Sequence, residues 1–141
     1  MNLNTIKEQL LQMGQKIALN VQEEDANSVT LHSEITAKQY FSDSIYLRIV
    51  VFSSGTMHLF LTFNEIERTY EKLYAINTFN AESAWFKAYV AHINGKDFLE
   101  LHYCAVALQN EQEVVDSFGF LLNDLLNENT LQYLKPIIKN D

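Results

Sequence analysis

The chain has 141 residues, a formal net charge of −8 at pH 7 and a single cysteine, Cys104. Hydrophobic residues make up 48% of it and aromatic residues 12%, which excludes a disordered chain and allows a buried core without disulfides or metal. The acidic charge disfavours nucleic acid as a partner because phosphate backbones repel it. No signal pattern and no apolar run of membrane length occurs, so we expect a single cytoplasmic domain over residues 1–141 with no membrane partner.

The first elements are predicted from hydrophobic spacing. Apolar residues at helical spacing predict a helix from Thr5 to Leu19, with Asn4 or Thr5 as its cap. The polar stretch from Gln22 to Ser28 is predicted to separate this helix from a short strand, Val29 to Ile35.

Two segments rich in β-branched and aromatic residues then predict a hairpin. They run from Ile45 to Phe52 and from Met57 to Phe63, and Ser53-Ser54-Gly55-Thr56 is the predicted turn. With that turn, one face carries Val50, Phe52, Leu59 and Leu61, and the other carries Leu47, Ile49, Val51 and Phe60. Both faces are apolar, which is typical of a sheet covered on both sides.

The rest of the chain predicts a helix, a second hairpin and a last long helix. Asn64 is expected to cap the helix that ends near Asn77. The second hairpin is expected over 84–108 with its turn at Asn94-Gly95, because this pair readily adopts the positive φ angles of a type I′ turn. Asn110 is expected to cap the last helix, and a short segment over 131–138 ends the chain. The predicted fold is α+β, with an antiparallel sheet of about five strands in the order α-β-β-β-α-β-β-α.

One face of the second hairpin is the candidate binding surface. A two-residue turn pairs Ile93 with Lys96, which places Lys87 opposite His102 and Tyr89 opposite Glu100. This face mixes large aromatic side chains with charge, as protein interfaces do. Its predicted members are Trp85, Lys87, Tyr89, Phe98, Glu100 and His102. Helices of the same chain, a second copy of the chain or a different protein could cover it.

Residues that could carry chemistry are few. The four histidines lack the spacing of known metal sites, and there is no Gly-rich phosphate loop or nucleophile elbow. Cys104 is expected to be a buried, inert thiol. Arg48, the one charge in an apolar strand, is expected to be an edge or interface residue with a packed stem rather than an anion ligand. We therefore expect a protein that is not an enzyme and has no metal or cofactor.

The stretch from Leu73 to Leu126 resembles the bacterial YbjN-like family, whose members are described as sensory-transduction regulators. The resemblance rests on Asn77-x-x-Asn80 at a helix end, followed by Ser83-x-Trp85-Phe86-Lys87-Ala88-Tyr89 opening a strand. That family is similar in fold to type III secretion chaperones, which are small, acidic, dimeric α+β proteins. The resemblance implies the element order given above and protein binding through a dimer, with no cofactor and no catalytic residues.

Three functions remain open at this point. The leading hypothesis is a homodimeric, cytoplasmic protein-binding or chaperone-like module, with itself and a further polypeptide as partners. The second is a small-ligand-sensing regulatory domain, with Lys87, Glu100, His102 and Arg48 lining a pocket. The third is an enzyme, which would need a concave site that gathers His58, His102 and Glu100.

Overall fold

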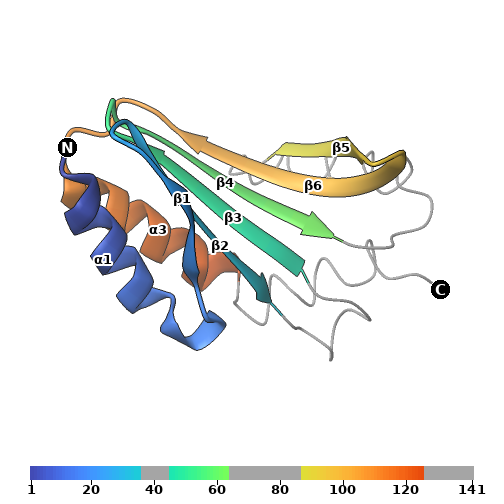
Figure 1. The fold of residues 1–141 in the computed structure, drawn as a ribbon, viewed down its shortest axis with the longest axis horizontal. Helices are drawn as coiled ribbons and strands as arrows, with labels where there is room; N and C mark the ends of the chain where they lie inside the picture. Colours follow the sequence, from blue (N-terminus) through green and yellow to red (C-terminus); the bar gives the residue numbers. More distant parts are fainter. Residues whose placement is uncertain (36–44, 64–86, 126–141) are drawn as a thin grey trace.

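The computed structural model describes residues 1–35, 45–63 and 87–125, which form a six-stranded antiparallel sheet and two α-helices (Figure 1). The strands lie side by side in the order β1-β2-β3-β4-β6-β5. The elements are α1 (Leu3–Met13), a 3-10 turn (Gln15–Ile17), β1 (Asn20–Glu24), β2 (Ser28–Ile35), β3 (Ile45–Phe52), β4 (Thr56–Phe63), β5 (Lys87–Ile93), β6 (Lys96–Ala105) and α3 (Glu111–Leu125). The expected α+β class and antiparallel sheet are confirmed.

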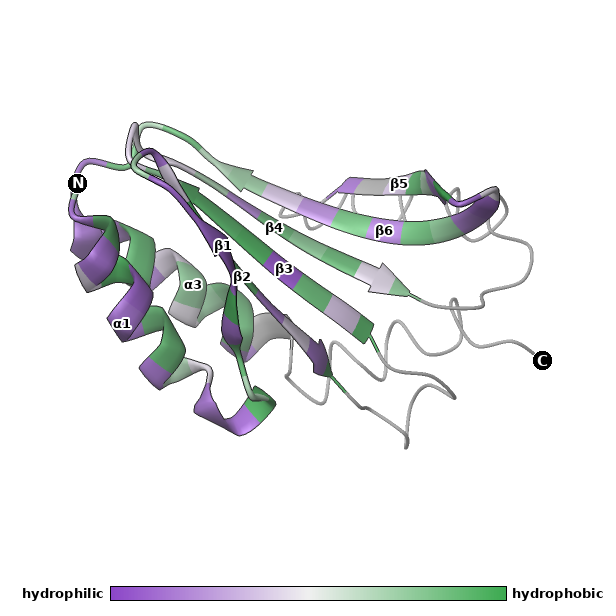
Figure 2. Cartoon of the chain, viewed as in Figure 1, coloured by the Kyte–Doolittle hydropathy of each residue, from purple (hydrophilic) through white to green (hydrophobic). Residues whose placement is uncertain are grey.

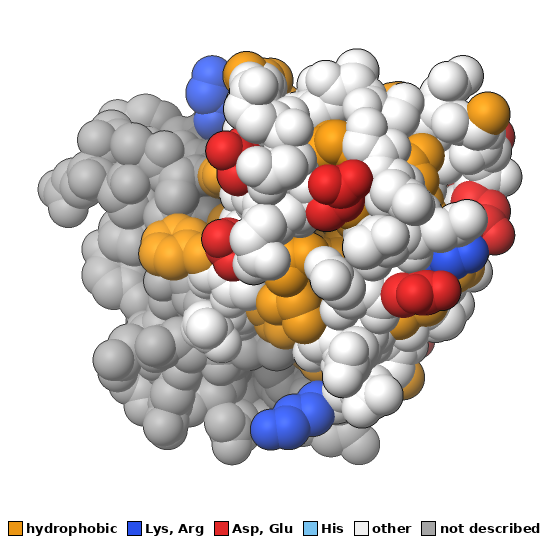
Figure 3. All heavy atoms as spheres, turned by 90° about the vertical axis from the view of Figure 1, so that its left-hand side faces the viewer, with side chains coloured by type: hydrophobic (Ala, Val, Ile, Leu, Met, Phe, Trp, Pro, Cys, Tyr) orange, Lys and Arg blue, Asp and Glu red, His pale blue; other side chains and the backbone are white. Residues whose placement is uncertain are grey.

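The two helices lie side by side and cover one face of the sheet (Figure 1). Ile6 and Leu10 of α1 lie four residues apart and are fully buried, as are Val114, Phe118 and Leu121 of α3. Fully burying one such side chain contributes roughly 1.5–3 kcal/mol to folding, so these five side chains stabilise the packing of the helices on the sheet. Acidic side chains are scattered over the side of the molecule seen in Figure 3, with apolar side chains between them.

Helix α1 begins earlier and ends sooner than the predicted range from Thr5 to Leu19. Its cap is Asn2, whose side-chain oxygen accepts a hydrogen bond from the Thr5 N–H at 3.1 Å, and not Asn4 or Thr5. The helix ends at Gly14, where a Cβ atom would lie only 2.5 Å from the Cβ of Leu19. Glycine at this position therefore lets the chain turn back and bury Leu19 against the end of the helix.

The sheet has one strand more than predicted, because the stretch expected as a loop after α1 contains β1. This strand pairs antiparallel with β2, and its register shifts between Val21 and Glu23. Four of its five residues are exposed. A short, charged and irregular strand of this kind is typical of a sheet edge, and its polarity hid it from the hydrophobic pattern.

The first hairpin has the expected strands, but the assignment of faces across it is wrong. Phe52 pairs with Thr56, so the loop has three residues and not four. Gly55 closes the loop at φ +98°, and its N–H donates to the Phe52 carbonyl at 3.0 Å. Leu59 therefore pairs with Ile49 on the helix side, and Phe60 pairs with Arg48 on the opposite side. A shift of one residue exchanges the two faces of a whole strand.

The second hairpin and the last helix confirm their predictions. Ile93 pairs with Lys96, and the turn residues Asn94 and Gly95 both have positive φ, as a type I′ turn requires. At the start of α3 the side-chain oxygen of Asn110 accepts from the Glu113 N–H at 3.0 Å.

Some expectations lie outside the described residues. These are the helix from Asn64 to Asn77, the segment over 131–138, and Trp85 and Phe86. Within the described ranges, no helix is long and apolar enough to cross a membrane.

Candidate functional site

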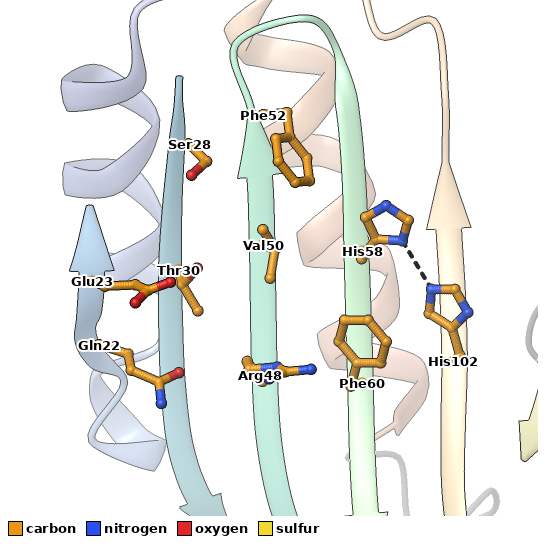
Figure 4. Close-up of a pocket in the computed structure, with 10 residues that line it drawn as sticks. All are labelled: Gln22, Glu23, Ser28, Thr30, Arg48, Val50, Phe52, His58, Phe60 and His102. Carbon is orange, nitrogen blue, oxygen red and sulfur yellow. Dashed lines mark hydrogen bonds between the residues drawn. The ribbon is translucent and has the colours of Figure 1, made fainter. Parts of the chain in front are cut away.

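The face of the sheet opposite α1 and α3, called the distal face below, carries the candidate site. In Figure 4 the two helices lie behind the strands, and the labelled side chains lie in front of them. β3 is hydrophobic along most of its length but carries one strongly hydrophilic band (Figure 2). The strand pairing places on this face Ser28, Thr30, His32, Arg48, Val50, Phe52, His58, Phe60, Thr62, Lys87, Tyr89, Phe98, Glu100, His102 and Cys104.

A hollow of about 610 Å³ lies on the distal face, across strands β1 to β4 and β6. One wall is apolar and aromatic, and the rest presents hydroxyl, imidazole, amide and guanidinium groups. The lining residues are Gln22, Glu23, Ser28, Thr30, Arg48, Val50, Phe52, His58, Phe60 and His102 (Figure 4). We call this site the Arg48 hollow.

Two histidines from different strands meet at one side of the hollow. His58 Nδ1 lies 2.9 Å from His102 Nε2, and the rings are stacked with centroids 5.1 Å apart. The hydrogen bond needs a proton on one nitrogen and a lone pair on the other, so at least one ring is neutral. Burial lowers the pKa of His102, and the nearby charges of His58 and Lys87 lower it further. His102 is therefore the ring of the pair that is held neutral at pH 7.

Arg48 lies at the centre of the sheet, and its expected position at an edge is wrong. Its guanidinium carbon is 4.6 Å from the centroid of the Phe60 ring, which also stacks on the His102 ring at 4.6 Å. Arg48 Nε is buried and has no hydrogen-bond acceptor in the described part of the chain, and neither ion pair described there includes Arg48. Among the described residues, the guanidinium thus contacts an aromatic ring and forms no ion pair with a carboxylate.

Five of the six predicted binding residues are described, and all five lie on the distal face, but one of these five lines the hollow. That residue is His102, whereas Lys87 and Tyr89 are exposed on β5, the edge strand that pairs with β6. Phe98 and Glu100 are half-buried on β6, and Glu100 Oε2 accepts a hydrogen bond from Thr62 Oγ1 at 3.2 Å. Trp85 lies outside the described residues.

Sequence reasoning missed the role of the first hairpin in this site. Phe60 was expected on the face with Ile49, but it lies opposite Arg48 beside the two histidines. The signal that could have revealed this is Gly55, because three-residue hairpin loops commonly place a glycine with positive φ at their last position. Cys104 is also not the buried thiol that was expected, since it is exposed on β6 opposite His58.

The described residues contain no group of three or more His, Cys, Asp and Glu side chains that could hold a metal ion. No protein-family model and no curated protein sequence matches the chain. The geometry of the distal face therefore carries the functional argument.

Proposed function

We propose that this chain is a non-enzymatic protein-binding module that acts as a homodimer, with the β5–β6 end of the distal face as the interface. The observation that carries the proposal is Tyr89, an aromatic side chain that is 45% exposed between Lys87 and Glu100. Tyrosine is enriched in interfaces because it combines a large apolar surface with a polar tip.

The charges around Tyr89 favour a second copy of the chain as its partner. In a two-fold symmetric dimer the same patch contacts itself, so it must be complementary to itself. Lys87 lies two residues before Tyr89 on β5, and Glu100 lies opposite Tyr89 on β6. In such a dimer Lys87 of one copy can pair with Glu100 of the other. Ile93, 47% exposed on the same edge strand, adds apolar area.

The resemblance to the YbjN-like family and to type III secretion chaperones supports the same proposal. Proteins of the chaperone class are dimers that hold another polypeptide, and we extend this chaperone-like role to the present chain. The motif residues Asn77, Asn80 and Trp85 lie outside the described part, so the support comes from their sequence alone. We place the protein in the cytoplasm on its composition.

The substitution Tyr89→Glu tests the interface. It should convert the dimer to a monomer, as measured by light scattering at micromolar concentration, because it buries a carboxylate without a partner in each half of the interface. Phe120→Glu is the matched control, since Phe120 is 65% exposed on α3, which lies on the other side of the sheet. If light scattering shows that the wild-type protein is a monomer, the proposal is wrong. Loss of the dimer in the Phe120 variant alone would move the interface to α3.

A second candidate function is small-ligand sensing by a regulatory domain. The Arg48 hollow is the observation that favours it, because it combines an apolar wall with convergent polar groups, as ligand sites do. A thermal-shift screen against metabolites tests it, since a ligand that binds only the folded state raises the melting temperature.

A further inference from the structure

We propose that the Arg48 hollow binds a small monoanionic carboxylate with a planar, apolar body, and that Arg48 and the wall around Phe60 form the binding site. This assignment does not depend on self-association, because Tyr89 does not line the hollow.

The first step is the unsatisfied Nε–H of Arg48. Arginine side chains that are partly buried in proteins are normally paired with an acid or hydrogen-bonded, because the charge and each N–H lose water on burial. Arg48 Nε has no acceptor among the described residues, and the aromatic ring at 4.6 Å gives only a cation–π contact. The guanidinium fork is planar and matches a carboxylate through two parallel hydrogen bonds. A carboxylate in the hollow would therefore give Arg48 an anionic partner, which neither ion pair of the described residues provides.

The second step is the charge of the hollow, which favours a monoanion. Among the described residues that line it, Arg48 is the single arginine and there is no lysine, and burial lowers the pKa of His102, which disfavours its charged form. Glu23 lies on β1, with β2 between it and β3. Two strand spacings are about 9.6 Å, close to the screening length of about 10 Å at 0.1 M salt, so this exposed carboxylate offsets Arg48 only weakly. A dianion such as phosphate would meet one guanidinium from these residues, in a chain of net charge −8, which disfavours it.

The third step is the shape and polarity of the remaining wall. Val50, Phe52 and Phe60 give an apolar surface next to the guanidinium, and the hydroxyl-bearing side chains Ser28 and Thr30 lie on the neighbouring strand β2 (Figure 4). A ligand whose carboxylate meets Arg48 can thus place a flat apolar body against the phenylalanine rings. Apolar walls with a few oriented polar groups are the usual make-up of small-molecule sites.

Benzoate is the probe, and benzamide is its neutral counterpart of nearly the same shape. Titration of the full chain at pH 7.5, followed by calorimetry and by backbone amide shifts, should show saturable benzoate binding with shifts centred on β3 and β4. Benzamide should bind about tenfold more weakly or worse, because a hydrogen bond to a charged group contributes about 1.5–3 kcal/mol and 1.4 kcal/mol is a factor of ten. Equal binding of the two probes, or no saturable binding of benzoate, would overturn the proposal.

Variants at Arg48 localise the binding. Arg48→Gln keeps a polar side chain but removes the charge, and should abolish the preference for benzoate over benzamide. Arg48→Lys keeps the charge but lacks the planar fork, so it should bind benzoate more weakly than the wild type and still prefer it to benzamide. Lys16→Gln is the matched control, since it removes an exposed cation of the 3-10 turn, outside the hollow, and should leave benzoate affinity unchanged. Wild-type benzoate affinity in a folded Arg48→Gln protein, or loss of affinity in Lys16→Gln, would contradict the assignment.

Discussion

The guanidinium of Arg48 packs on the ring of Phe60 directly across the β3–β4 pair, while Arg48 Nε remains buried without an acceptor. The same side chain therefore makes a favourable cation–π contact and carries an unfavourable, unsatisfied N–H group. A cation–π contact at a partly exposed site contributes about 0.5–1 kcal/mol, whereas an unsatisfied buried N–H costs about 1–3 kcal/mol. On balance Arg48 is expected to destabilise the unliganded protein.

Replacement of Arg48 by methionine should therefore raise the stability of the unliganded protein. Methionine keeps an unbranched stem and a contact with Phe60 but removes the unsatisfied N–H. We expect the free energy of unfolding, measured by urea denaturation, to rise by about 1 kcal/mol. Arg48→Ala is the companion variant and should not show the gain, because it leaves space beside the ring. A loss of stability in Arg48→Met would mean that the guanidinium supports the fold.

Acidification should destabilise the protein through His102. The native pKa of this histidine is lowered by burial, so the unfolded chain binds more protons than the native state between that lowered pKa and about 6.5. The free energy of unfolding should therefore begin to fall as the pH drops through about 6.5, and the loss from this group is complete below its native pKa. His102→Gln should flatten this part of the stability profile. The control variant His92→Gln, at the exposed end of the hairpin, should still show the fall in the free energy of unfolding that His102 causes on acidification.

The contribution of His102 can be separated from that of the carboxylates by its pH range. A hydrogen bond from the Asn2 backbone N–H, at 2.6 Å, lowers the pKa of Glu111, so this group favours the folded state above its ordinary pKa and loses that contribution only at lower pH. If His102→Gln left the profile between pH 5 and 7 (roughly one unit or more above the ordinary Glu range) unchanged, His102 would not be the titrating group.

Gly55 and Gly95 should respond differently to the same substitution. Both have positive φ, so alanine strains the backbone at either position by about 1 kcal/mol or more. At Gly55 the added methyl group would also lie 2.4 Å from the backbone oxygen of Leu108, whereas at Gly95 it meets nothing within 4 Å. Thermal or urea unfolding should therefore show a loss for Gly55→Ala that exceeds the loss for Gly95→Ala by about 1–3 kcal/mol. Equal losses of stability in the two variants would show that the backbone at Leu108 can move away from the added methyl group without cost.

The sequence predicted the parts of the fold that depend on local signals. Asn94-Gly95 determines its own turn type, so the pairing of Lys87 with His102 followed directly from the sequence. Asn110 and Glu113 likewise mark the start of α3 through a local hydrogen bond. In each case the interacting residues are close in sequence, and tertiary packing does not change the outcome.

The wrong assignment of faces arose where the length of one loop determines which way every side chain of the next strand points. The loop at Ser53 to Gly55 is one residue shorter than the predicted turn, and this difference places Phe60 on the face opposite the predicted one. The candidate site therefore lies nearer the centre of the sheet than the predicted β5–β6 hairpin. β1 was missed for a different reason, because an exposed edge strand has no apolar alternation to detect.

The pairing of α1 with α3 has a consequence for how the protein is made. The two helices come from opposite ends of the described chain, with the β1–β4 meander and the β5–β6 hairpin between them. During synthesis Ile6 and Leu10 leave the ribosome before their neighbours on α3, which emerge more than a hundred residues later. The chain must lose the entropy of closing this long loop before the contacts between the two helices form. Refolding is therefore expected to take on the order of milliseconds to seconds rather than microseconds. Until α3 has been synthesised, the nascent chain exposes the apolar faces of α1 and of the sheet, and such exposed apolar surface is what chaperones bind.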